Sequence, residues 1–124
     1  NYKTYGHDPK RDFGSDNPVK IGKEVRKWLS NFMISEPLVK MLVQGPHAVD
    51  MVRKIVGPTM PHLAEMGTIR GDYSADSAIS ANIDHRAIYN LLHASETPAE
   101  AKHEIKHWFG KQPVYKYKRF GGDE

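Results

Sequence analysis

The chain has 124 residues, 39% of them hydrophobic and 27% charged, a composition typical of one soluble globular domain over residues 1–124 that argues against long disordered stretches. It contains no cysteine, which excludes disulfides and thiolate metal sites, and the lack of a span-length apolar run or a recognisable signal peptide predicts a cytoplasmic protein without membrane contact. Eighteen Lys and Arg against 15 Asp and Glu give a net charge of +3, which favours anionic partners such as nucleotide phosphates or nucleic acid.

The N-terminal half predicts a helix followed by a strand. The helix is expected to begin at Asn17 and Pro18, because asparagine is a good N-cap and proline suits the first helical position. The apolar side chains that recur at helical spacing along it are Ile21, Val25, Trp28, Leu29, Phe32 and Met33. The apolar run at residues 37–44 then predicts a mostly buried strand.

A second helix is predicted over residues 48–56, where the apolar residues form one stripe. Gly57 is expected to end it as a left-handed cap, with Pro58 as the breaker. Residues 58–89 show no sustained period, so we expect a long loop, which in a compact domain is normally functional or disordered. Thr59 and Arg70 in this loop favour a functional one.

The C-terminal part predicts a short strand at residues 90–94 and then a helix. Thr97 and Glu100 form a capping box, with a proline at the first helical position. The side chains expected to face inward from this helix are Ala101, Ile105 and Trp108. The basic, aromatic tail at residues 115–124 is expected to be extended.

Residues 103–110, HEIKHWFG, contain the H-E-x-x-H pattern of zinc peptidases, in which both histidines bind one metal ion. On a helix, His103 and His107 fall nearly opposite the inward-facing side chains, so both would point into solvent instead of toward a third ligand. The longer form of the signature also expects a histidine where this chain has Pro113. We therefore predict two exposed helix histidines and no metal site.

His93 belongs to a different group of residues that could carry chemistry. It stands between a predicted strand and a helix start, where backbone N–H groups and the helix dipole favour a bound phosphate. A structural histidine would be the ordinary interpretation, but Arg53, Thr59 and Arg70 are phosphate-binding residue types on or beside the long loop. Glu104 can face back toward His93. A carboxylate bonded to one imidazole nitrogen fixes the tautomer and leaves the other nitrogen free to attack.

Three blocks of the sequence, VRKIVGPT (52–59), GTIRGDY (67–73) and NLLHASET (90–97), closely resemble the signature of the nucleoside diphosphate kinases. Their order and the spacing Arg…Gly-x-Thr…Arg…Asn-x-x-His-x-Ser match that family apart from one insertion, over about residues 29–109. The resemblance implies an α/β (α+β) fold, a ferredoxin-like α/β sandwich in which helices pack on an antiparallel sheet.

The resemblance also implies a ping-pong reaction. His93 would take the γ-phosphate of a nucleoside triphosphate such as ATP, become a phosphohistidine and pass the group to a nucleoside diphosphate. The residues that match the family's other functional positions are Arg53, Thr59 and Arg70 for the phosphates, Asn90 for the ribose, and Glu104 with Ser95 for orienting the histidine. Magnesium would be bound by the nucleotide phosphates and not by a set of protein ligands. Homo-oligomers, hexamers or tetramers, are implied as well.

The chain departs from the family pattern near its start. A first strand, with a lysine in a K-P-D turn that reaches the nucleotide, is absent from residues 1–124. Residues 1–25 resemble an insertion found in one branch of the family, and Val25 and Leu29 are the candidates for stacking on the base. Because a ferredoxin-like core needs four strands and we predict only two, we expect this chain to be the N-terminally incomplete part of a longer polypeptide.

Two other functions stay open beside the kinase. One is a catalytically impaired relative, which the missing lysine would favour. The other is a module that binds nucleotides or nucleic acid, which the basic, aromatic tail would favour. The strand at residues 37–44 lacks the exposed aromatic residues of a base-stacking platform, so nucleic acid is the less favoured partner. Retention of His93, Asn90 and both arginines favours the kinase.

Overall fold

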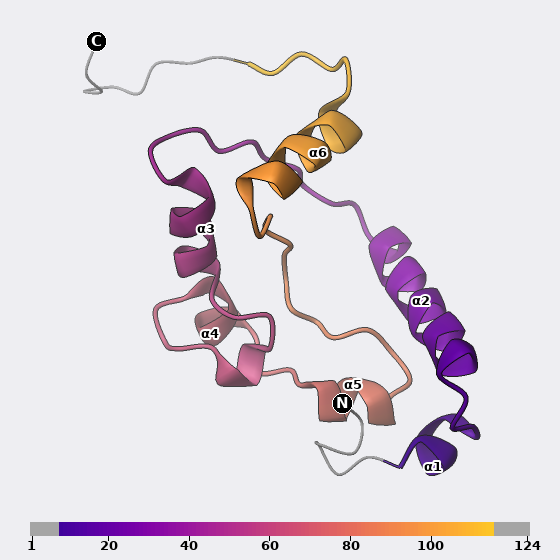
Figure 1. The fold of residues 1–124 in the computed structure, drawn as a ribbon. Helices are drawn as coiled ribbons and strands as arrows, with labels where there is room; N and C mark the ends of the chain where they lie inside the picture. Colours follow the sequence, from indigo (N-terminus) through magenta and orange to yellow (C-terminus); the bar gives the residue numbers. More distant parts are fainter. Residues whose placement is uncertain (1–7, 116–124) are drawn as a thin grey trace.

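The computed structural model describes residues 8–115, so the tail predicted to be extended lies outside the described residues from position 116 onward. Helices joined by irregular segments make up the described part of the chain (Figure 1). They are α1 (Pro9–Phe13), α2 (Pro18–Ser35), α3 (Ala48–Val56), α4 (Ile69–Tyr73), α5 (Ala78–Ile83) and α6 (Pro98–Phe109), with the 3₁₀ turn η2 (Pro61–Leu63) between α3 and α4. None of these helices is both long and apolar enough to cross a lipid bilayer.

The long helix α2 begins where the sequence predicts, so that prediction is confirmed. Asn17 Oδ1 accepts hydrogen bonds from the backbone N–H groups of Val19 at 2.9 Å and Lys20 at 3.3 Å. These bonds satisfy donors that the start of a helix leaves free. The helix then continues through Gly22 to Ser35.

Aromatic side chains fix α2 beside the segment between α5 and α6. The Trp28 ring stacks on that of Phe13 with the centroids 5.3 Å apart, and it meets the His85 ring edge-on at 5.7 Å. About one turn later, the Phe32 ring lies 5.6 Å from that of Tyr89. As a result, α2 runs along one side of this segment, while α3 and α4 lie on its other side (Figure 1).

The two predicted strands, residues 37–44 and 90–94, do not form within the described residues. A strand needs hydrogen bonds to a neighbouring strand, and these two segments run past different elements. Lys40 Nζ donates to the backbone oxygen of Trp108 and to Gln112 Oε1, both at 2.6 Å. Residues 37–44 therefore cross the end of α6, and the predicted ferredoxin-like sheet is not assembled within this part of the chain.

The segment predicted as a long loop, residues 58–89, contains η2, α4 and α5. The prediction is wrong because helices of three to six residues are too short to show a hydrophobic period. Their N-caps carry the local signal instead. Thr68 Oγ1 accepts a hydrogen bond from Gly71 N at 3.1 Å, and Ser77 Oγ accepts one from Ser80 N at 3.2 Å.

An ion pair between Asp76 and Arg86 organises the end of this segment. The Arg86 guanidinium donates to both carboxylate oxygens of Asp76, at 2.6 and 3.1 Å, and Tyr89 N donates to the same carboxylate at 2.7 Å. Arg86 also lies over the Tyr89 ring, 4.2 Å from its centroid. The hydrogen bonds from Arg86 lower the pKa of Asp76 to about 2, so the pair stays ionised at neutral pH and fixes the chain just before Asn90.

The buried core of the described residues is small and lies around α3, η2, α4 and α5. Its members are Val56, Pro61, Arg70, Ala81 and Ala87. The face of α6 predicted to turn inward is partly open, because Ile105 is 38% and Trp108 39% exposed. That predicted burial is therefore wrong for residues 8–115, which form no sheet against which α6 could pack.

Two glycines allow close contact around the start of α4. A Cβ at Gly71 would lie 2.1 Å from the backbone oxygen of Glu65, and a Cβ at Gly57 would lie 2.7 Å from Thr68 Oγ1. The predicted left-handed cap at Gly57 is only partly correct. Its φ of 83° is positive, but its ψ of 175° is extended, so α3 ends in a different turn.

Gly71→Ala is expected to lower the free energy of unfolding by about 1–3 kcal/mol, because the added methyl group must displace a backbone oxygen. The matched control is Gly22→Ala in α2, where no atom lies within 4 Å of the added Cβ. That change should raise the free energy of unfolding by about 0.5–1 kcal/mol. Urea denaturation followed by circular dichroism measures both. A Gly71→Ala protein as stable as the unchanged chain would contradict the close contact.

Candidate active site

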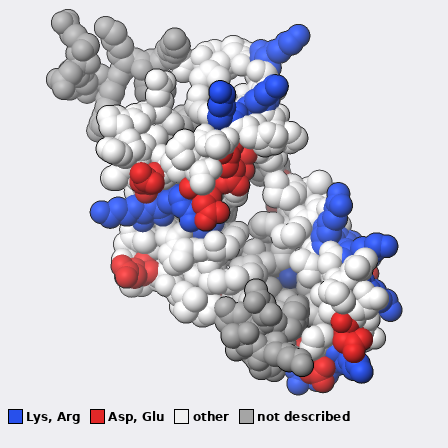
Figure 2. Space-filling model, in the orientation of Figure 1, with Lys and Arg blue, Asp and Glu red and all other residues white. Residues whose placement is uncertain are grey.

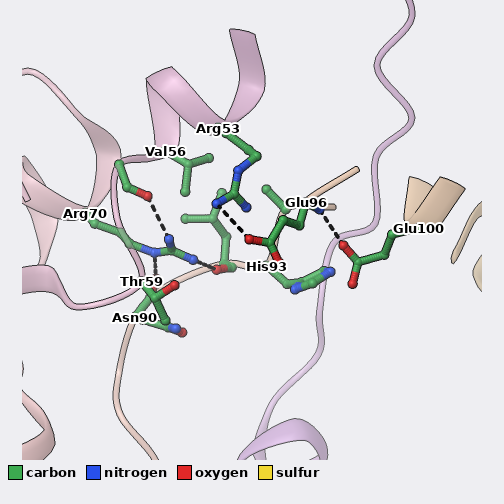
Figure 3. Close-up of a pocket in the computed structure, with 11 residues that line it drawn as sticks. Arg53, Val56, Thr59, Arg70, Asn90, His93, Glu96 and Glu100 are labelled. Carbon is green, nitrogen blue, oxygen red and sulfur yellow. Dashed lines mark hydrogen bonds and ion pairs between the residues drawn. The ribbon is translucent and has the colours of Figure 1, made fainter. Parts of the chain in front are cut away.

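One cleft gathers most of the residues that the sequence marks for chemistry (Figure 3). It lies between α3, α4 and the segment that leads into α6. The residues that line it are Arg53, Val56, Gly57, Thr59, Arg70, Asn90, Leu92, His93, Ala94, Glu96 and Glu100. The residues proposed for the phosphates, the ribose and the nucleophile therefore meet at one place.

His93 is hydrogen-bonded to Glu104, the contact that the position of Glu104 along the helix predicts. Nε2 of the imidazole lies 2.7 Å from Oε1 of the carboxylate. The other carboxylate oxygen accepts a hydrogen bond from Ser95 Oγ at 2.7 Å. The His93 side chain is 66% exposed and that of Glu104 23%, so an accessible ring is held by a more protected carboxylate. With Nε2 occupied, Nδ1 is the ring nitrogen left for chemistry.

The Glu104 carboxylate is held in its ionised form. The hydrogen bond from Ser95 is the largest cause of its lowered pKa, while partial burial opposes the shift. The hydrogen bond to His93, and then the charges of His93 and His103, lower the pKa further. An anionic acceptor at Nε2 favours the tautomer that carries its proton there, because that N–H can donate to it.

Arg70 is more restrained than a free phosphate ligand would be. It is buried, with 7% of its surface exposed. Its guanidinium donates to the backbone oxygens of Asn90 at 3.0 Å, Gly57 at 2.8 Å and Leu92 at 2.6 Å (Figure 3). Burial, followed by the charge of Arg53, lowers the pKa of Arg70, although an arginine stays charged in proteins. Arg70 thus joins the end of α3 to the segment that precedes α6.

Arg53 and two carboxylates form another edge of the cleft. Arg53 Nη2 is 3.9 Å from Glu96 Oε1, and these side chains are 44% and 74% exposed, so the pair is weak and screened by solvent. The predicted capping box is half confirmed. Thr97 Oγ1 accepts from Glu100 N at 3.1 Å, but the Glu100 carboxylate accepts from Glu96 N instead of Thr97 N. Arg53 is therefore available to an incoming anion.

Glu96 and Glu100 also line the cleft but were not predicted from the sequence as site residues. The capping sequence could have indicated them, because it places acidic residues at the helix start that follows His93. Conversely, Val25 and Leu29 lie on α2 and are not among the residues that line the cleft. Their contact with a base stays a prediction.

The H-E-x-x-H pair lies on the solvent side of α6. His103 and His107 are both exposed, whereas Glu104, beside His103 in the sequence, is bonded to His93. Residues 8–115 contain no group of three or more histidine, aspartate or glutamate side chains placed to hold a metal ion. The glutamate of the motif is thus turned toward a histidine outside the motif.

Comparison with known proteins identifies the family. A family model described as nucleoside diphosphate kinase matches residues 15–114. The chain belongs to the nucleoside diphosphate kinase family. The nucleoside diphosphate kinase of Pyrobaculum aerophilum is 47% identical over 113 residues, which are 91% of this chain and 62% of that relative.

Two solved nucleoside diphosphate kinase structures resemble this one. A crystal structure of the NDP kinase from Pyrobaculum aerophilum matches with a TM-score of 0.83 and 46% identity, covering 93% of this chain and 63% of that chain. A transition-state mimic of the nucleoside diphosphate kinase from Borrelia burgdorferi, with bound vanadate and ADP, matches with a TM-score of 0.57 and 44% identity. It covers 60% of this chain and 45% of that chain. These nucleoside diphosphate kinases imply a ferredoxin-like α/β fold.

Proposed function

We propose that the protein is a nucleoside diphosphate kinase that transfers the γ-phosphate of a nucleoside triphosphate such as ATP to a nucleoside diphosphate. The transfer passes through a phosphohistidine on His93. The observation that carries the proposal is the 2.7 Å contact between His93 Nε2 and Glu104 Oε1, beside a cleft lined by two arginines. Membership of the family, from the match to residues 15–114, supports the same reaction.

In the first half-reaction, Nδ1 of His93 attacks the γ-phosphorus. The N–P bond forms as the bond from this phosphorus to the β–γ bridging oxygen breaks, and the nucleoside diphosphate leaves. The proton stays on Nε2 and remains hydrogen-bonded to Glu104, whose negative charge offsets the positive charge that develops on the ring. Ser95 holds the other oxygen of Glu104, which keeps the ring and the carboxylate aligned. The second half-reaction reverses these steps with another nucleoside diphosphate.

We assign Arg53, Thr59 and Arg70 to the β- and γ-phosphates. All three line the cleft with His93, and phosphoryl transfer depends mainly on positioning and charge neutralisation. Two guanidinium groups and a hydroxyl supply both. Arg53 is weakly held, so it is the one expected to move toward the phosphates, whereas Arg70 stays in place on its carbonyls. Asn90, which lines the same cleft, is assigned to the ribose hydroxyl.

A divalent metal ion, which we propose to be Mg²⁺, would be held by the nucleotide's phosphate oxygens and would offset their charge. The residues present fit such an ion. Mg²⁺ keeps several of its waters and is bound through substrate phosphates and one or two carboxylates. Glu96 and Glu100 are the carboxylates that line the cleft, and they would accept hydrogen bonds from those waters.

Val25 and Leu29 are the proposed contacts of the base, and homo-oligomers, hexamers or tetramers, are the proposed assembly. Both assignments are supported by the family resemblance. The structure places the two residues on α2, and Leu29 is 51% exposed, so a flat apolar ligand or another protein surface could reach it.

A nucleic-acid-binding module is less well supported. Binding to a phosphate backbone needs clustered positive charge. On the face shown in Figure 2, acidic side chains lie among the basic ones, and the described residues visible there form no continuous basic stripe. The basic tail that would favour this function lies outside the described residues beyond position 115.

Incubation with [γ-³²P]ATP tests the proposed function. The protein should take up label that is lost in acid and that moves to an added nucleoside diphosphate during a chase, because an N–P bond on a histidine is acid-labile and the reaction is ping-pong. A protein that binds ATP but takes up no label would be the catalytically impaired relative, and this result would overturn the assignment.

A further inference from the structure

The backbone just before His93 has an unusual conformation. Leu91 has a φ of 70°, in the left-handed region that residues with a Cβ seldom adopt. Leu92 N donates to the backbone oxygen of Asn90 at 2.9 Å, which closes a three-residue turn centred on Leu91. Turns of this kind with positive φ are rare and strained. Leu91 is 49% exposed, so burial of its side chain does not account for the turn.

Arg70 bonds to both residues that flank Leu91. Its Nε donates to Asn90 O at 3.0 Å and its Nη2 to Leu92 O at 2.6 Å. Its Nη1 donates to Gly57 O at 2.8 Å, at the end of α3. Because a guanidinium is planar and its donors have fixed directions, the relative positions of these carbonyls are set by one side chain. The turn is therefore tied to the helix on the opposite wall of the cleft.

We propose that Arg70 is a positioning residue for the nucleophile: it holds the strained turn at Leu91 and so sets the place of His93 in the cleft. His93 follows Leu92 directly, and its side chain is 66% exposed. Among the described residues its side chain has one hydrogen bond, to Glu104. The backbone must therefore supply much of the ring's orientation.

This role adds to the phosphate contact assigned to Arg70. A guanidinium has five N–H donors, and the bonds to the carbonyls of Gly57, Asn90 and Leu92 occupy three of them. The two that remain are left for a phosphate in the cleft that Arg70 lines. The inference rests on the proposed function, because the place of His93 affects the rate only where His93 is the nucleophile.

Two substitutions separate positioning from phosphate binding. Arg70→Lys keeps the positive charge but cannot bond three carbonyls in a plane, and Leu91→Gly removes the steric cost of a positive φ. We expect Arg70→Lys to slow single-turnover phosphorylation of His93 by about 10- to 100-fold, with a smaller change in KM for ATP. Addition of Leu91→Gly should restore about threefold or more of the lost rate, because glycine adopts this turn without a brace.

Leu91→Ala in the Arg70→Lys background is the matched control. Alanine removes the same side chain as glycine but keeps the Cβ that opposes positive φ, so it should restore no activity. Equal recovery with alanine and glycine, or no recovery with glycine, would overturn the proposal. A raised KM with an unchanged phosphorylation rate in Arg70→Lys would do the same.

Two further measurements keep the test independent of the folding of Arg70→Lys and of activity. Leu91→Val retains Arg70, and its β-branched side chain resists the turn more strongly, so an unchanged phosphorylation rate in this variant overturns the proposal. Amide hydrogen exchange of Leu92 by NMR should be about 10-fold faster or more in Arg70→Lys, with the α2 amides unchanged. If the unchanged protein takes up no label, the proposed kinase function is wrong, but hydrogen exchange still tests whether Arg70 holds the turn. Unaltered hydrogen exchange at Leu92 in Arg70→Lys would show that Arg70 does not hold it.

Discussion

His93→Ala is expected to lower kcat by about 10⁴-fold or more and to abolish the acid-labile label on the protein. The reason is covalent: without the Nδ1 nitrogen no phosphorylated intermediate forms, and the arginines of the cleft can bind the phosphates but cannot carry them. A coupled assay of nucleoside triphosphate formation measures the first effect, and γ-labelled ATP measures the second. Label that persists in His93→Ala would show that another residue is the nucleophile.

A double substitution in the H-E-x-x-H motif is the matched control for the loss of a histidine. His103 and His107 are exposed on α6, so changing both to alanine should leave phosphotransfer within a few fold of the unchanged protein. Metal analysis of the purified protein should also find no stoichiometric zinc. A double variant as inactive as His93→Ala, or a tightly bound zinc ion, would reverse the interpretation of this motif.

Glu104→Ala is expected to slow phosphotransfer by about 10²-fold, with little change in KM. Glu104 bonds to Nε2 of His93, so its loss frees the ring to rotate and removes the negative charge that stabilises the phosphorylated imidazole. Glu104→Gln keeps a hydrogen-bond acceptor without the charge, so its rate of phosphotransfer should lie between those of Glu104→Ala and the unchanged protein. Steady-state kinetics with varied nucleoside diphosphate separates kcat from KM.

Ser95→Ala is expected to have a smaller effect on kcat than Glu104→Ala. Ser95 Oγ donates to Glu104 Oε2 at 2.7 Å, whereas the hydrogen bond to the His93 ring comes from Glu104. Ser95 therefore acts on His93 through Glu104, and its removal should lower kcat by about 10-fold or less. An effect of Glu104→Ala on KM alone would mean that the carboxylate acts in binding. A Ser95→Ala variant slower than Glu104→Ala would mean that the serine acts directly.

The sequence predicts those parts of the structure that depend on local order. The start of α2 at Asn17, the extent of α3 and the capping of α6 by Thr97 follow from residues within a few positions of one another. The pairing of His93 with Glu104 was also predictable, because Glu104 lies about two turns into the helix that follows His93, on an edge that can face back toward it. Local interactions of this kind depend on neighbouring residues and not on the rest of the fold.

Features that depend on distant partners were not predictable in the same way. The residues at 37–44 have a strand's composition, but a strand forms only where a neighbour bonds to it. The three carbonyls that bind Arg70 come from residues 13 to 22 positions away, and no spacing rule connects them. A phosphate-binding arginine and a buried brace share one residue type, so only the contacts distinguish their roles.

The exposed run at residues 37–44 is expected to affect how the described part of the chain associates in solution. Val39 is 84% and Met41 76% exposed, and no hydrogen-bonded ladder joins this run to another segment of residues 8–115. An apolar extended run with unpaired backbone groups is a template for pairing with a second chain. We therefore expect these residues to self-associate as their concentration rises, unless another strand covers the run.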